Sequence, residues 1–235
     1  LGSPIAFHVN GQTIALLLVS AIITSGSDTL IRSHPRLQLD AGHVHPATHW
    51  IMPGFAALAV GMMLTVPPMG PAWWLGLALG VTCLTLLLIA EYAVVDPIEG
   101  GFPAARLCIT MLAYLTILSL LSWLLRNVAQ VAPLTVLIAG LIAFRLLVLH
   151  GASYRQAGIN GLVVGLVLAE CTWVLGNWAI PPLVSALVLL TVLHLITGLI
   201  QHSLSQSLPQ RTLLLEYGVV GVIALGFLLG FTLRD

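Results

Sequence analysis

The sequence has almost no charge and no lysine at all. Only 7% of its 235 residues are charged, whereas 59% are hydrophobic, and a soluble domain usually carries about a quarter charged residues. So few charges could not cover a water-exposed surface, which excludes an ordinary soluble domain. All basic residues are arginines and the net charge is zero, so the composition indicates no nucleic-acid partner.

Cysteine is also scarce, and common catalytic signatures are missing. Cys83, Cys108 and Cys171 all lie in apolar runs, and no two of them form a CxxC pair. We therefore expect small buried side chains there, not disulfides or metal ligands. The sequence contains no Walker A motif, no GxSxG motif and no dinucleotide-binding fingerprint, which argues against the enzyme classes that these motifs define.

Long apolar runs dominate what remains. A helix needs roughly 20 apolar residues to cross the hydrocarbon core, and a helix satisfies its own backbone hydrogen bonds in lipid. We therefore predict an all-α fold, a polytopic transmembrane helical bundle of about eight spans with short loops, as a single integral membrane domain over residues 1–235. The predicted spans are 8–24, 49–66, 72–95, 102–125, 133–150, 158–178, 182–202 and 213–233.

The arginines predict how the bundle is oriented. If eight helices alternate in direction, most arginines fall in loops on one side of the membrane. These are Arg32, Arg36, Arg106, Arg155 and Arg211, with Arg145 just inside that side and only Arg126 and Arg234 on the other. Positive residues favour the cytoplasm. We therefore predict a bacterial plasma-membrane protein with both termini on the non-cytoplasmic side.

Ionisable residues inside the predicted spans are functional candidates because they are costly in lipid. Glu91, Arg145, His194 and Glu216 come from four helices and lie toward the predicted inner end, which predicts an intramembrane polar cluster with a buried ion-pair network. The alternative is that these side chains snorkel to the inner interface. Glu170 lies nearer the outer half and is a proton-carrier candidate; otherwise it is a neutral acid bonded to a neighbouring hydroxyl or carbonyl.

Histidine is the residue type here that could hold a metal or cofactor. His43 and His45, in the predicted loop 25–48, and His49, the first residue of the next predicted span, are compatible with a metal site. His194 and His202 share a polar helix face, where a histidine could ligate haem or a chlorophyll-type pigment. The alternatives are a histidine-rich interfacial loop and histidines that only make hydrogen bonds.

A group of charges surrounds the predicted connection between the third and fourth spans. Asp96, Glu99 and Arg106 form the densest charge group in the chain, and they could coordinate a cation or bind a lipid head group. As structure alone, Asp96 with the following proline ends one helix, and the glycine pair at 100–101 turns the chain into the next.

Three functions stay open at this point. The first is a non-catalytic subunit or scaffold of a larger membrane complex, with membrane lipids and other membrane subunits as partners, holding a pigment, haem or lipid in an energy-converting assembly. The second is a proton- or ion-coupled secondary transporter that uses the intramembrane Glu, Arg and His residues. The third is a membrane enzyme acting on a lipid or quinone at the inner interface. Short loops and the missing catalytic signatures favour the first.

Overall fold

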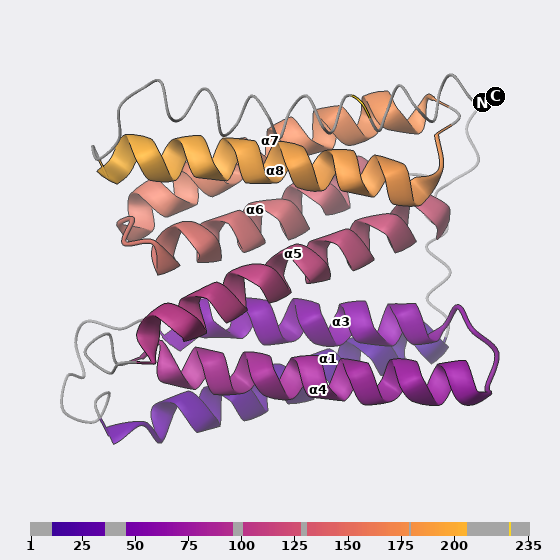
Figure 1. The fold of residues 1–235 in the computed structure, drawn as a ribbon, viewed down its shortest axis with the longest axis horizontal. Coiled ribbons are helices and arrows are strands. Elements are labelled where there is room, and N and C mark those ends of the chain that lie inside the picture. The colour runs from indigo at the N-terminus through magenta and orange to yellow at the C-terminus, as the bar shows by residue number, and fades with distance from the viewer. Residues whose placement is uncertain are drawn as a thin grey trace.

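Seven apolar helices pack side by side in the computed structural model, which describes residues 11–35, 46–95, 101–127, 131–178, 180–205 and 226 (Figure 1). A short 3-10 helix, η1 (Pro46–Trp50), leads directly into α3, and the described residues contain no strand. The helices are α1 (Gly11–Arg32), α3 (Ile51–Leu64), α4 (Pro71–Ala93), α5 (Phe102–Asn127), α6 (Val131–Leu149), α7 (Tyr154–Gly176) and α8 (Pro182–Ser205).

Six of these helices, all except α3, are long and apolar enough to cross a membrane. The chain is therefore an all-α integral membrane protein, as its composition predicts. The predicted count of about eight spans is not established. The run predicted at 49–66 forms the 14-residue α3, and the run at 213–233 lies outside the described residues.

Prolines and interior packing explain why α3 is short. Pro46 begins η1, and Pro67 and Pro68 follow soon after α3 ends; proline cannot donate a backbone hydrogen bond and disfavours helix in the residue before it. The helix contacts α1, α4 and α5, so its apolar side chains pack largely against protein. At its end, Trp73 Nε1 donates a hydrogen bond to the Leu64 carbonyl at 3.1 Å, which satisfies one carbonyl of the last turn.

Helix α1 departs furthest from its predicted bounds. The sequence predicts that this span ends at residue 24 and that a loop covers 25–48, whereas α1 continues to Arg32. The hydroxyls of Ser27 and Thr29 donate to carbonyls of the preceding helical turn, and Arg32 pairs with Asp28 one turn earlier. These local bonds allow a polar segment to remain helical. The prediction that a loop begins at residue 25 is therefore wrong.

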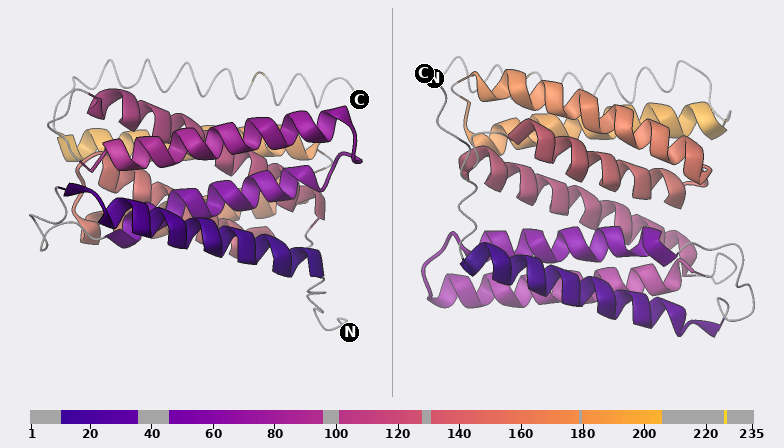
Figure 2. Two further views of the ribbon diagram at one scale, coloured as in Figure 1. Left: turned by 90° about the horizontal axis from the view of Figure 1, so that it is seen from below. Right: turned by 180° about the vertical axis from the view of Figure 1, so that it is seen from behind.

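Two groups of helices flank α5. In Figures 1 and 2, α1, α3 and α4 lie on one side of α5, and α6, α7 and α8 lie on the other. Helices α6 and α7 approach most closely, because glycines form their contact: a Cβ atom added at Gly165 would lie 2.5 Å from the Val136 carbonyl oxygen, and one at Gly161 would lie 2.8 Å from that of Gly140. Small residues permit this close approach in membrane bundles.

Successive helices alternate in direction. The helix ends that flank the connections α1–η1, α4–α5 and α6–α7 therefore lie at one end of the bundle, drawn at the left in Figure 1. We call this end the arginine end, because Arg32, Arg106 and Arg155 lie in the helical turns next to these connections.

Candidate functional site

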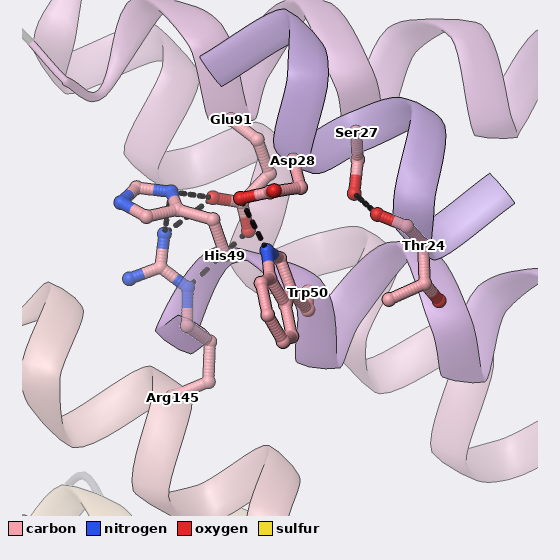
Figure 3. A network of polar contacts seen from close by, with 7 residues as sticks. All are labelled: Thr24, Ser27, Asp28, His49, Trp50, Glu91 and Arg145. Carbon is pink, nitrogen blue, oxygen red and sulfur yellow. Dashed lines mark hydrogen bonds and ion pairs between the residues drawn. The ribbon is translucent and has the colours of Figure 1, made fainter. Parts of the chain in front are cut away.

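Three ionisable side chains meet inside the bundle near the arginine end (Figure 3). His49 comes from η1, Glu91 from α4 and Arg145 from α6. His49 Nδ1 lies 2.7 Å from Glu91 Oε2. Arg145 Nε donates to Glu91 Oε1 at 3.3 Å, and Arg145 Nη2 forms an ion pair with Glu91 Oε2. We call these residues the buried triad, because their side chains are exposed by only 6%, 0% and 2% respectively.

Local helix geometry explains why these three side chains point inward. Glu91 lies in the last turn of α4, one turn after the fully buried Leu87 and on the same helix face. Arg145 follows Ile142 on the inward face of α6, one turn before the helix ends. His49 reaches the pair because η1 continues directly into α3 and holds its side chain inside the bundle.

The contacts of His49 determine where its proton lies. A carboxylate only accepts hydrogen bonds and a guanidinium only donates them. His49 Nδ1 lies closer to Glu91 Oε2 than to Arg145 Nη2, which is 3.2 Å away, so we assign the proton to Nδ1 and let it donate to Glu91. Figure 3 shows the other ring nitrogen, Nε2, on the far side of the ring from the carboxylate.

A second polar group ties α1 to η1 beside the triad. Trp50 Nε1 donates to Asp28 Oδ1 at 3.0 Å, and Arg32 Nε donates to the same carboxylate at 2.8 Å. The rings of His34 and Tyr92 are in contact, with centroids 4.6 Å apart and planes tilted by 57°. The C-terminal end of α1 and the residues just after it therefore contact Trp50 and Tyr92. These two residues directly follow His49 and Glu91 in the sequence.

The predicted intramembrane cluster is only partly assembled within the described residues. Glu91 and Arg145 are in contact, whereas His194 lies between α8 and α5, with its Nδ1 2.8 Å from the Tyr114 hydroxyl. Glu216 lies outside the described residues. Among the described residues, the pair also contacts His49.

Glu170, predicted as a proton carrier, lies on the exposed surface of α7. It borders a shallow surface hollow together with Ala132, Leu166 and Trp173. At a rise of about 1.5 Å per residue, its Cα lies about 9 Å from the Gly176 end of α7, within the hydrocarbon region. No hydrogen bond or ion pair joins its carboxyl to the described residues.

Of the residues predicted to hold a metal or cofactor, the structure describes His49 in η1 and His194 and His202 in α8. Within the described residues, no group of three or more His, Cys, Asp or Glu side chains could hold a metal ion. His49 turns toward Glu91, and His202 lies in the last turn of α8. His43 and His45 lie outside the described residues, so a metal, haem or pigment at these histidines stays a prediction.

The predicted loop charge group is described only at Arg106, in the first turns of α5, because Asp96 and Glu99 lie outside the described residues. The positive charge of Arg106 affects the pKa of His150, the residue that follows the end of α6. Burial lowers the pKa of the His150 imidazole, and the positive charge of Arg106 lowers it further, whereas the hydrogen bond from His150 to the Leu146 carbonyl at 2.7 Å opposes the shift.

Comparison with known protein families places the chain in one of them, because one family model matches residues 1–230. The chain belongs to the family described as "Protein of unknown function (DUF5656)". Comparison with curated proteins and with solved structures finds no match. The match includes the buried triad and Glu170, so both belong to the DUF5656 region of the chain.

Sequence reasoning about this DUF5656 chain missed two contacts. It assigned His49 to a loop with His43 and His45, but η1 holds His49 against Glu91. It also gave no role to Tyr114, which bonds to His194. A buried arginine signals that partners are needed, but the choice of partner depends on which helices are neighbours.

Proposed function

We propose that this protein is a non-catalytic subunit of a larger membrane assembly and that it contacts its neighbour through α7. The proposal rests on the position of Glu170, whose carboxyl is exposed on α7 within the hydrocarbon region. A carboxyl group at this depth is costly on a surface that faces lipid, and such residues in membrane proteins normally face the protein interior or pair with another group. A neighbouring transmembrane helix with a basic or hydrogen-bond-donating side chain at the same depth would satisfy the carboxyl.

The surroundings of Glu170 support a protein partner. Trp173, one turn further along α7, is 69% exposed, and Leu166, one turn earlier, is 49% exposed. Aromatic residues are enriched in protein interfaces, and the hollow beside Glu170 offers a place for a side chain from the partner. The buried triad fits a structural role in the same protein, because each member is engaged by another.

The test is recovery of the intact assembly in mild detergent from cells that make the tagged full chain at its natural level. We expect the wild-type chain to co-purify with defined membrane subunits and Glu170→Leu to lose them while remaining folded. Leu86→Gln is the matched control, because it changes the polarity of an exposed position on α4. Recovery of the wild-type chain as a lone monomer, or unchanged partners with Glu170→Leu, would contradict the proposal.

A second candidate function, a proton-coupled carrier, is favoured by one feature of the triad. His49 and Arg145 both contact the single oxygen Oε2 of Glu91. A proton added at His49 Nε2 would place two positive charges, those of His49 and Arg145, beside one carboxylate. Their mutual repulsion would weaken the ion pair between Arg145 and Glu91. Uptake of a proton at η1 would thus loosen the link between α4 and α6.

Proteoliposomes with an imposed pH gradient and an internal pH-sensitive dye distinguish the two functions. A carrier that uses the triad moves protons in the wild type and loses this flux in His49→Gln. A carrier that uses the carboxyl on α7 loses flux in Glu170→Gln. No flux in the wild type removes the carrier and leaves the subunit proposal standing.

A further inference from the structure

An apolar cavity of about 240 Å³ lies between α3, α4 and α5, apart from the triad and from Glu170. Its walls include the exposed Leu79 and Leu115 as well as the fully buried Leu87, so the cavity runs from the outer surface of the bundle into its core. Gly76 and Gly80 line it where α4 packs closely on α3: an added Cβ atom would lie 2.4 Å from Val60 at Gly80 and 3.3 Å from Leu64 at Gly76.

Two hydroxyl groups of α5, those of Thr116 and Ser119, are the unusual feature of this cavity. Most helical threonines of the described chain donate to the carbonyl four residues earlier, as Thr110, Thr135 and Thr197 do. Thr116 is 95% buried, being only 5% exposed, yet no hydrogen bond joins its hydroxyl to the described residues. Ser119, one turn further on, lines the same cavity, and its hydroxyl likewise has no partner among them.

The depth of Thr116 restricts what can satisfy it. Thr116 is about 16 Å from the Asn127 end of α5 and about 21 Å from the Phe102 end, at a rise of about 1.5 Å per residue. It therefore lies near the middle of a hydrocarbon core about 30 Å thick. A water at this depth would find only the hydroxyls of Thr116 and Ser119 as partners, the minimum that a buried water needs, because the other lining residues are apolar or glycine. A phospholipid tail has no acceptor at this depth.

We propose that the cavity binds a neutral ring-bearing lipid of the quinone class, with a ring carbonyl accepting a hydrogen bond from Thr116. The cavity is larger than the engineered cavity of about 150 Å³ that holds benzene, so a single ring fits. A carbonyl oxygen satisfies Thr116 or Ser119, and the apolar ring and prenyl chain match the remaining walls. The opening beside Leu79 and Leu115 lets the chain extend into the bilayer.

Binding is measured on the full chain in lipid nanodiscs, from the rise in thermal unfolding midpoint with probe concentration. The probes are a fully ring-substituted decylbenzoquinone and decylbenzene, which has the same chain and a ring without carbonyls. We expect the quinone to bind more tightly than decylbenzene. Thr116→Val should weaken quinone binding by roughly threefold to tenfold, the value of one hydrogen bond, and should leave decylbenzene binding unchanged.

Two variants serve as controls. Thr85→Val removes a hydroxyl that already bonds to its own helix at the Val81 carbonyl and should not alter binding. Thr116→Ser keeps the hydroxyl and should retain tighter binding of the quinone, which separates loss of the hydrogen bond from loss of fold. Protection of Cys83, which lines the cavity, from a membrane-permeant maleimide gives a second readout, with Cys108 and Cys171 as internal references.

Three results would overturn the proposal. Equal binding of the two probes would mean that the cavity accepts any hydrocarbon and that Thr116 has no part in recognition. Absence of binding by either probe would remove the site. Unchanged quinone affinity in Thr116→Val, with the fold intact, would remove the assigned hydrogen bond. None of these results bears on whether α7 contacts a partner subunit.

Discussion

Arg145 and Glu91 carry opposite charges at a place where water reaches neither of them. Their side chains are 2% and 0% exposed, so each charge relies on the other and on His49. Removing one member of such a pair leaves an uncompensated buried charge, which costs far more than the net value of the intact pair. The triad is thus the place where a single substitution should affect stability most.

Arg145→Met tests this at the level of the residue. We expect the free energy of unfolding to fall by about 3–5 kcal/mol, measured by denaturant unfolding in detergent micelles. Arg155→Met, at an exposed position in the first turn of α7, should change it by less than about 0.5 kcal/mol. The double variant Glu91→Gln with Arg145→Met should regain part of the loss, because no buried charge is then left alone. Equal stabilities of Arg145→Met and Arg155→Met would contradict the assigned pairing.

His150 gives a pH dependence whose sign can be worked out. Its pKa in the folded protein is lowered, mainly by burial, so the unfolded chain binds a proton more readily than the folded one. Stability due to this group therefore decreases as pH falls below the unfolded value of about 6.5. We expect the unfolding midpoint of the wild type to drop more between pH 7 and pH 5 than that of His150→Gln. Parallel pH curves for the two proteins would refute this.

At the scale of the element, the sequence predicts apolar spans well and their polar ends poorly. Spans α4, α5 and α6 begin and end close to their predicted positions, because lipid requires long apolar runs. The extension of α1 past residue 24 depends on side-chain bonds such as that between Asp28 and Arg32, which hydropathy does not register. The meeting of His49 with Glu91 depends on neighbouring helices and on η1, and no local pattern in the chain specifies either.

The α6–α7 contact offers a matched pair of glycine substitutions on one helix. A Cβ atom at Gly165 would press on the backbone of α6, whereas one at Gly158 would meet nothing within 4 Å. We expect Gly165→Ala to destabilise the protein by more than about 1 kcal/mol, since the helices must separate. Gly158→Ala should stabilise it by about 0.5–1 kcal/mol, because alanine is the better helix former. Thermal unfolding in one detergent would compare them, and equal effects would show that the close approach is absent.

At the scale of the whole molecule, the alternating helix directions and the positions of the arginines predict which end of the bundle faces the cytoplasm. Arg32, Arg106 and Arg155 lie toward one end of the bundle and Arg126 toward the other. From the positive-inside rule, we propose that the arginine end faces the cytoplasm. In this orientation, α1 would begin on the non-cytoplasmic side of the membrane, as the sequence analysis predicts.

Cysteine accessibility in intact cells checks this orientation. In a background with all three native cysteines replaced by serine, a single cysteine at Asn177 should react with a membrane-impermeant maleimide. A cysteine at Ala152, in the α6–α7 connection, should react only after the membrane is permeabilised. The opposite pattern would invert the bundle in the membrane.

The glycine contact between α6 and α7 also has a consequence for biosynthesis. The connection between the two helices is short, and Ser153 and Gln156 close it with a reciprocal capping box. At a synthesis rate of about 5–20 residues per second, the ribosome completes both helices within seconds of each other, before the last turns of α8 exist. The hairpin can therefore enter the bilayer as an already paired unit, and a defect in its glycines would show first as failed insertion and degradation of the nascent chain.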